Sequence, residues 1–202
     1  MTVGRSSPPG RFDAAIAAID AVNADDPQTV VVGGVVRPKE LAHAEMMTAW
    51  VRRLDPDASD AQLLAARAHH LRRWSIARST YPEGRKGYLQ WRTALKRQHA
   101  DEVATILREV GYDDETIARV QKMVRKEGLV HDAAVQTHED ALCLVFIEMQ
   151  FNELATRLGD DHMVEVVRKT FAKMSPCAVD LALELPLEPR DLAIVLRAGP
   201  LD

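Results

Sequence analysis

The segment 141–151, which reads Ala-Leu-Cys-Leu-Val-Phe-Ile-Glu-Met-Gln-Phe, constrains the fold more than any other part of the chain. Nine of its eleven residues are apolar, the exceptions being Glu148 and Gln150. A helix of this composition has no polar face to turn towards water, so it has to be buried on all sides. We therefore predict that this segment forms the central helix of a helical bundle.

Apolar residues recur at intervals of three and four through most of the remaining sequence, which is typical of amphipathic helices. This spacing predicts further helices over residues 12–22, 38–54, 59–74, 88–110, 113–128, 160–174, 175–185 and 188–198. One segment, Val30–Val36, is strand-like instead and contains Gly33-Gly34, a pair that suits the tight turn of a β-hairpin. The predicted fold class is all-α, a helical bundle with one small β-hairpin near the N-terminus.

The chain length of 202 residues suits one compact domain. We expect residues 1–11 to form a flexible N-terminal segment and residues 12–202 a single helical domain, with a core at 37–155 and C-terminal helices at 160–202. The first ten residues lack the apolar stretch of a signal peptide, and no apolar run approaches the roughly 20 residues of a membrane span. Two cysteines do not make a disulfide framework, so we expect a cytoplasmic protein.

Four polar residues fall where the helical periodicity predicts core: His43, His69, His70 and Asp140. A buried polar group without a partner costs about 1–3 kcal/mol, and a shared metal ion would satisfy all four. Three imidazoles and one carboxylate suit Mn, Fe, Co, Ni or Zn better than Mg or Ca, which prefer oxygen ligands. The alternative is that each is a hydrogen-bonded core residue, which is the commoner role of a lone buried histidine.

The order of these residues resembles the HD-domain superfamily of metal-dependent phosphohydrolases. His43 lies in Glu-Leu-Ala-His-Ala-Glu, His69 in Ala-Arg-Ala-His-His-Leu and Asp140 in His-Glu-Asp-Ala-Leu. The resemblance covers about residues 37–155 and implies an HD-like helical bundle with a metal held by His43, His69, His70 and Asp140. One position departs from the pattern, because His70 stands where the superfamily has the Asp that its members use at the reaction centre.

The chain also resembles a smaller subgroup of bacterial and fungal proteins that carry a domain of unknown function. The segments Arg-Pro-Lys-Glu-Leu, at 37–41, and Glu-Asp-Ala-Leu-Cys-Leu-Val-Phe, at 139–146, recur in that subgroup. This second resemblance indicates a family but implies no activity.

Other residues near the predicted ligands could support them. His99 is in phase with core positions of its helix, and the HD resemblance places a further histidine there in many members; we weigh it as a core residue or as support for a ligand. Glu40, one turn before His43, could accept the second N–H of that imidazole or face solvent. His138 and Glu139 flank Asp140 and could orient a ligand or bound water, or could be solvated. Glu139 is the nearest candidate for a general base, and Asp140 would act with it at the reaction centre.

The chain has a formal net charge of −4, yet the stretch between His70 and Gln98 holds eight basic residues and one acidic residue. Arginine binds phosphate oxygens bidentately, so this cluster predicts a clamp for a phosphorylated substrate. The predicted substrate-binding residues are Arg72, Arg73, Arg78, Arg85, Lys86 and Arg92. Tyr81, Tyr88 and Trp91 offer faces on which a base could stack. The alternative is a solvated helical face.

Three functions are consistent with these patterns. The leading hypothesis is a metal-dependent phosphohydrolase that acts on a nucleotide or another phosphate ester, with a divalent transition metal as cofactor. The second is an HD-type iron oxygenase, in which a second iron would recruit His99. The third is a non-enzymatic module that binds a nucleotide or RNA through the basic segment. We expect a phosphorylated small molecule as partner and no membrane, and the sequence leaves nucleic-acid binding and the oligomeric state open.

Overall fold

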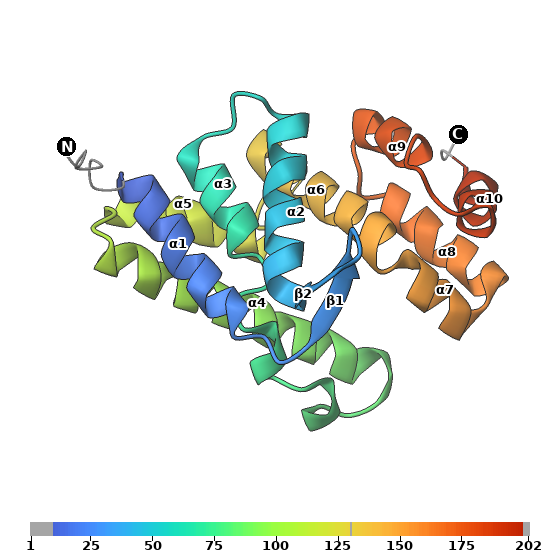
Figure 1. Cartoon of the computed structure of the whole chain (residues 1–202), viewed down its shortest axis with the longest axis horizontal. Helices are drawn as coiled ribbons and strands as arrows, with labels where there is room; N and C mark the ends of the chain where they lie inside the picture. The colour runs from blue at the N-terminus through green and yellow to red at the C-terminus, as the bar shows by residue number, and fades with distance from the viewer. Residues whose placement is uncertain (1–9, 130, 200–202) are drawn as a thin grey trace, which may run out of the picture. The chain divides into compact units, whose positions relative to one another are not determined.

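The computed structural model describes residues 10–129 and 131–199, which form ten α-helices and one antiparallel β-hairpin (Figure 1). The chain divides into two compact units: residues 1–44 with 59–125 make unit 1, and residues 45–58 with 126–202 make unit 2. The predicted fold class, all-α with one small hairpin near the N-terminus, is confirmed.

Unit 1 contains the hairpin and the helices that precede residue 126. Its elements are α1 (Arg11–Ala24), β1 (Thr29–Val32), β2 (Val35–Pro38), the first six residues of α2 (Lys39–Leu54), α3 (Asp60–Arg67), α4 (Gly84–Glu109) and α5 (Asp114–Arg125), with short 3-10 turns at Arg73–Ser75 and Arg78–Thr80. Unit 2 contains the rest of α2, then α6 (Ala133–Met149), α7 (Phe151–Leu158), α8 (Asp160–Phe171), α9 (Pro176–Leu183) and α10 (Pro189–Ala198).

The core of unit 1 lies between α1, α3, α4 and α5. Helix α4 packs against α1 and α5, and α3 packs against the same two helices. Leu64, Leu95 and Leu107 are almost fully buried between them. The start of α3 is fixed by a capping box, in which Ser59 and Gln62 satisfy each other's backbone N–H groups.

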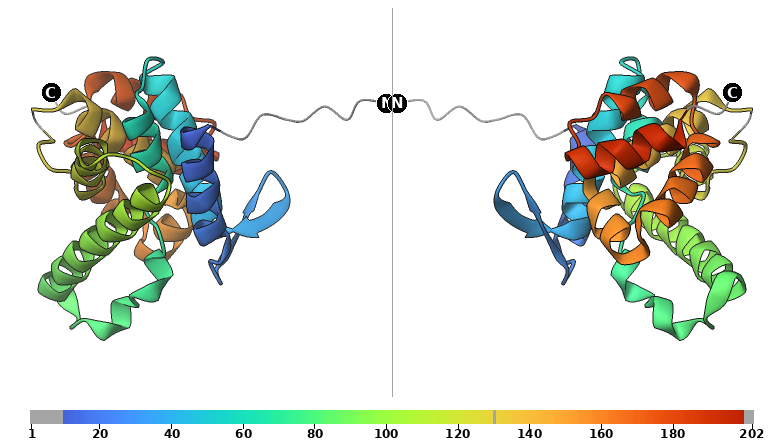
Figure 2. Two further views of the ribbon diagram at one scale, coloured as in Figure 1. Left: turned by 90° about the vertical axis from the view of Figure 1, so that its left-hand side faces the viewer. Right: turned by 90° about the vertical axis from the view of Figure 1, so that its right-hand side faces the viewer.

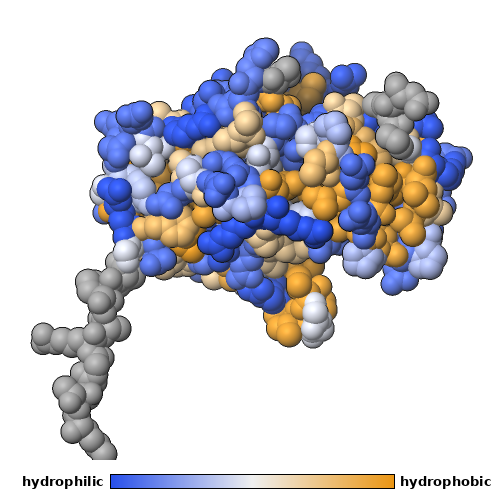
Figure 3. Space-filling model, turned by 90° about the horizontal axis from the view of Figure 1, so that it is seen from above, coloured by the Kyte–Doolittle hydropathy of each residue, from blue (hydrophilic) through white to orange (hydrophobic). Residues whose placement is uncertain are grey.

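The hairpin has the geometry that its sequence predicts. Val32 pairs with Val35 across the turn, and Gly33 and Gly34 have φ angles of 57° and 81°, as a type I′ turn requires. The hairpin projects from the helices of its unit (Figure 2). Val31, Val35 and Val36 are exposed, and the hairpin forms an apolar projection at the lower edge of Figure 3.

Helix α6 is the buried helix of unit 2, as its composition predicts. Between residues 141 and 151 only Glu148 is exposed, and its carboxylate accepts a hydrogen bond of 2.8 Å from Trp50 Nε1 of α2. Within the unit, α6 packs against α7 and α9, and α8 packs against α7 and α10. The helix begins at Ala133, eight residues before its apolar part.

Two predictions about helix boundaries are wrong. The helix expected over 59–74 ends at Arg67, and residues 68–72 form consecutive turns that end in Arg72, whose φ is +50°. In addition, α7 is a helix that the apolar spacing did not predict; it follows α6 after a break at Gln150. At the N-terminus, residues 1–9 of the expected flexible segment lie outside the described residues, and α1 begins at Arg11. Among the helices that the structure describes, none has the length and apolar character needed to cross a bilayer.

Candidate metal centre

Four histidines from three segments of unit 1 lie together. His43 belongs to α2, His69 and His70 to the turn after α3, and His99 to α4. The centroid of the His70 ring is 4.2 Å from that of His43, 4.6 Å from that of His69 and 5.9 Å from that of His99. Three of the four are buried, and the side chain of His70 is 15% exposed. The structure therefore brings together all three histidines of the predicted ligand set and adds His99.

The early end of α3 makes this arrangement feasible. Neighbouring side chains on a helix point about 100° apart, whereas the turn at 68–72 allows both His69 and His70 to lie in the cluster. Two consecutive carbonyl groups fasten this turn to α4: Leu71 O lies 2.7 Å from His99 Nδ1, and Arg72 O accepts a 3.2 Å hydrogen bond from Gln98 Nε2.

Glu40 is the carboxylate of this cluster. It is 7% exposed, and its Oε2 lies 3.0 Å from His70 Nδ1. Glu40, His43 and His70 each have a potential ligand atom, and these three atoms lie within 4.8 Å of one another. From the sequence, Glu40 could accept an N–H of His43 on the same helix or face solvent, whereas its carboxylate contacts His70 from another segment. The backbone N–H of Glu40 donates a 3.0 Å hydrogen bond to Asp26 Oδ2, and this bond holds the first turn of α2.

Burial determines the protonation of this cluster. It raises the pKa of Glu40 to about 7, although the nearby Arg73 guanidinium opposes the shift. Burial also holds the pKa of His70 well below its usual range, with His43 and the other imidazoles acting in the same direction. The pKa of His99 falls to about 4 through burial, although its hydrogen bond to Leu71 favours the charged form. Both imidazoles are therefore neutral at pH 7.

The hydrogen bonds fix which ring nitrogen carries the proton. A carbonyl can only accept, so His99 Nδ1 donates to Leu71 O and the lone pair is on Nε2. That buried Nε2 has no hydrogen-bond partner among the residues that the structure describes. An ionised Glu40 likewise keeps the proton of His70 on Nδ1. Metal-binding histidines have this arrangement, with one nitrogen donating to a fixed oxygen and the other free to ligate, so the donor set fits a divalent transition metal.

Asp140, the fourth predicted ligand, lies in unit 2 and is buried there. Its Oδ1 accepts hydrogen bonds from Gln136 Nε2 at 2.8 Å and from Ser175 N at 2.9 Å, and its Oδ2 accepts from Ser175 Oγ at 2.6 Å. Ser175 also caps α9 through Ala178 N. Asp140 thus connects α6 to the start of α9.

Glu139 and His138 are also buried in unit 2. The carboxylate of Glu139 lies 2.6 Å from Lys126 Nζ and 3.2 Å from Lys173 Nζ. Burial would raise the pKa of Glu139, but the two ammonium groups outweigh it and hold this pKa below its ordinary value. The pKa of His138 falls to about 3, chiefly through burial and then through Lys126. A carboxylate stabilised by two cations is a weak base, which disfavours Glu139 as the proton acceptor of a reaction.

Of the six predicted substrate-binding cations, Arg73 lies nearest the histidines. Its Nε is 3.9 Å from Glu40 Oε1, and its guanidinium lies 4.8 Å from the centroid of the Trp91 ring. Arg92 lies 5.8 Å from the centroid of the Tyr88 ring.

The other four cations have different surroundings. Arg72 lies 3.7 Å from Glu102. Arg78 donates hydrogen bonds of 3.0 to 3.4 Å to three carbonyl groups of residues 81–84, so it holds the loop before α4. Arg85 and Lys86 are exposed in the first turn of α4.

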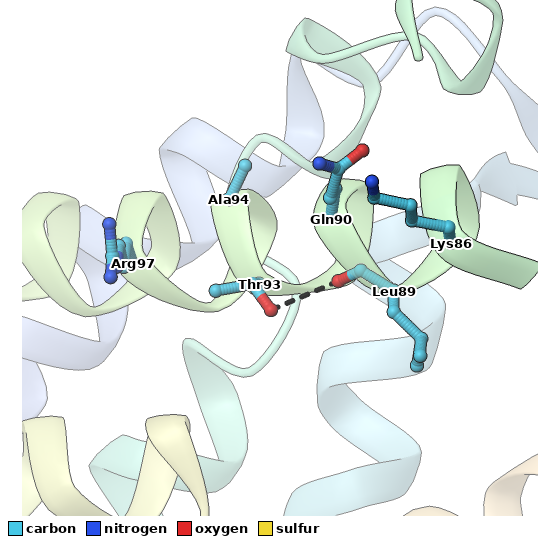
Figure 4. A pocket seen from close by; sticks show the side chains of 6 residues that line it. All are labelled: Lys86, Leu89, Gln90, Thr93, Ala94 and Arg97. Carbon is cyan, nitrogen blue, oxygen red and sulfur yellow. Dashed lines mark hydrogen bonds between the residues drawn. The ribbon is translucent and has the colours of Figure 1, made fainter. Parts of the chain in front are cut away.

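A shallow hollow of about 400 Å³ follows one face of α4 (Figure 4). The residues that line it are Lys86, Leu89, Gln90, Thr93, Ala94 and Arg97. At about 100° per residue, Thr93 and Arg97 lie well away from His99 around the helix axis. The hollow holds no histidine and no carboxylate, and it is separate from the candidate metal centre.

Comparison with known proteins gives a family but no activity. No curated protein and no solved structure matches the chain. Residues 13–195 match the family described as Domain of unknown function (DUF4202). This confirms the resemblance to a family that carries a domain of unknown function. Because the match covers nearly the whole chain, the protein belongs to the DUF4202 family.

Proposed function

We propose that the protein is a metal-dependent phosphohydrolase whose divalent transition metal, one of Mn, Fe, Co, Ni or Zn, binds to the histidine cluster of unit 1. His43 and His70, which have potential ligand atoms within 4.8 Å of each other, would hold the ion together with His99, whose ring centroid is 5.9 Å from that of His70, and His69 lies beside them. The observation that supports this most strongly is His99, because its buried Nε2 lone pair has no hydrogen-bond partner among the described residues while Nδ1 is fixed by Leu71 O. All four histidines belong to unit 1.

The chain's own groups prepare the site for a phosphate ester. The carbonyl of Leu71 keeps the ring proton of His99 on Nδ1, and Glu40, when ionised, does the same for His70, so that each Nε2 is a ligand atom. A bound ion of this class lowers the pKa of a coordinated water and polarises a phosphoryl oxygen. Arg73, 3.9 Å from Glu40, supplies positive charge for the phosphoryl oxygens at the edge of the cluster.

The choice of phosphate-ester hydrolysis rests on two further observations. The first is the basic segment, in which Arg73 lies 3.9 Å from Glu40 of the cluster. The second is the resemblance of the segments around His43 and His69 to the HD-domain superfamily, although His70 replaces the Asp of that pattern. Glu139 is not assigned a role as base, since Lys126 and Lys173 stabilise its ionised form.

The test is the metal content of the purified full chain, compared with His70→Ala and with a control, His162→Ala, which changes an exposed histidine of α8. We expect about one equivalent of a transition metal in the wild type and the control, and its loss in His70→Ala. Hydrolysis of p-nitrophenyl phosphate and of nucleotides, measured with the bound ion, should be lost in the same variant.

Three results would count against the proposal. A chain that holds no metal even after reconstitution would exclude the metal centre. A chain that binds metal but hydrolyses no phosphate ester would leave the metal centre and remove the hydrolase. Retention of iron with consumption of oxygen would favour the iron oxygenase.

A further inference from the structure

We infer that Arg73, Tyr88, Trp91 and Arg92 form a binding site for a mononucleotide, with its phosphate at the two arginines and its base on the aromatic rings. This inference rests on the proposed function, because it identifies the class of phosphate ester that the histidine cluster would receive. The four residues are called the cation–aromatic cluster below.

The cluster is built on one turn of α4 and on the 3-10 turn at Arg73–Ser75. The Tyr88 and Trp91 rings have centroids 6.0 Å apart and an interplanar angle of 42°. Each ring has an arginine over it, Arg73 at 4.8 Å from the Trp91 centroid and Arg92 at 5.8 Å from the Tyr88 centroid. Trp91 Nε1 donates a 2.9 Å hydrogen bond to Ile76 O, which fixes the orientation of the indole.

Among the described residues, the two positive charges of Arg73 and Arg92 have a single carboxylate partner, that of Glu40, which pairs with Arg73. Arg92 has no ion pair with an acid in the part of the chain that the structure describes, and its hydrogen bond to Tyr88 Oη is 3.5 Å long. Arg73 is 3.9 Å from a single carboxylate, Glu40. The two guanidinium groups lie over neighbouring rings whose centroids are 6.0 Å apart, and burial and the charge of Arg92 both lower the pKa of Arg73, although Glu40 opposes them. A phosphate between them would neutralise both charges and accept bidentate hydrogen bonds.

The anion site lies next to the histidine cluster, because Glu40 contacts both. Glu40 contacts His70 through one carboxylate oxygen and Arg73 through the other. A phosphate bound by Arg73 therefore lies beside the candidate metal centre. Among the other predicted cations, Arg72 pairs with Glu102 and Arg78 donates to backbone carbonyls, while Arg85 and Lys86 are exposed in the first turn of α4.

The aromatic rings favour a nucleotide over a simple sugar phosphate. Tyr88 is 41% exposed, so a ligand can reach this side chain from solvent. Any of the nucleobases can stack on such a ring, and arginine adds a cation–π contribution. One pair of rings with one pair of arginines matches one base and one phosphate, which favours a mononucleotide over a polymer.

The test is calorimetric titration of the full, metal-free chain, so that no hydrolysis occurs, with AMP, ribose 5-phosphate and a single-stranded oligonucleotide. The variants are Arg92→Gln and Tyr88→Leu. The matched controls are Arg108→Gln, an exposed arginine in the last turn of the same helix, and Tyr88→Phe, which keeps the ring.

We expect AMP affinity to fall about tenfold or more in Arg92→Gln and Tyr88→Leu and to stay within about twofold in both controls. Ribose 5-phosphate should bind more weakly than AMP and be insensitive to Tyr88→Leu. Equal AMP affinity in Arg92→Gln and wild type, or equal affinity for AMP and ribose 5-phosphate, would overturn the inference. An oligonucleotide that binds more tightly than AMP, with a steep salt dependence, would replace the mononucleotide by a nucleic acid.

The two proposals fail separately. Nucleotide binding without metal-dependent hydrolysis would remove the hydrolase and leave the nucleotide site. Hydrolysis of p-nitrophenyl phosphate by a chain that binds no AMP would remove the nucleotide site and leave the hydrolase.

Discussion

Replacement of Glu40 by Gln tests whether this residue positions His70 for metal binding. At pH 8, above the pKa of about 7 of Glu40, the substitution keeps the size of the side chain and removes its negative charge. A hydrogen bond to a buried charged group contributes about 1.5–3 kcal/mol and a neutral one about 1 kcal/mol, so the 3.0 Å contact with His70 Nδ1 should weaken by about 0.5–2 kcal/mol. Since each 1.4 kcal/mol is a factor of ten, metal affinity should fall about twofold to thirtyfold, which overlaps the tenfold to hundredfold loss usual for groups that orient a ligating histidine.

The assay is a titration of the metal-free chain with Zn²⁺ against a chromogenic chelator. Glu115→Gln is the control, because it makes the same chemical change at an exposed glutamate in the first turn of α5, outside the histidine cluster. Nitrogen NMR of the histidine rings gives a second measurement, since loss of the carboxylate should allow the proton of His70 to move between Nδ1 and Nε2.

An unchanged affinity in Glu40→Gln would refute this reasoning. A loss beyond about a thousandfold would also contradict it, because that magnitude indicates that a direct metal ligand has been removed rather than a positioning group. Glu40 also lies close enough to His43 and His70 to be a metal ligand itself. The titration distinguishes a ligand from a residue that only positions His70.

Three further predictions concern stability, each measured by urea denaturation. Glu139→Gln removes the negative charge 2.6 Å from Lys126, whose side chain is 7% exposed, and should lower the free energy of unfolding by about 3 kcal/mol. Gly87→Ala would place a Cβ 1.9 Å from Pro82 O, so the loop before α4 must move, at a cost of about 1–3 kcal/mol; an unchanged midpoint would show that the loop gives way freely. Leu107→Ala should cost about 3 kcal/mol through the cavity it leaves, and a loss under about 1 kcal/mol would mean that the core of unit 1 collapses around it.

The sequence predicts what depends on local periodicity and turn chemistry. The apolar segment at 141–151 requires a buried helix, and Gly33-Gly34 specifies the hairpin, because both features act through neighbouring residues. The end of α3 at Arg67 could not be predicted in the same way. No glycine or proline marks it, and the turn at 68–72 is held by hydrogen bonds to His99 and Gln98, which lie far along the chain.

The candidate site shows the same division. Periodicity identified His43, His69 and His99 as core positions, and all three are buried. For Glu40, the sequence offered only His43 on the same helix or solvent as a partner. Tertiary packing brings its carboxylate to His70 instead. Asp26 was not singled out, although it holds the backbone of Glu40, because nothing in the Asp-Pro turn indicates which amide the carboxylate will accept.

The connections within the histidine cluster also have a consequence for the order of folding. Glu40 and His70 are 30 residues apart, and Leu71 and His99 are 28 residues apart, so no single segment holds the ligand set. Closure of both loops has to precede the site, and contacts of this kind form after the local helices. An ion that binds only the completed cluster would stabilise the folded chain, and it is expected to slow unfolding more than it speeds refolding.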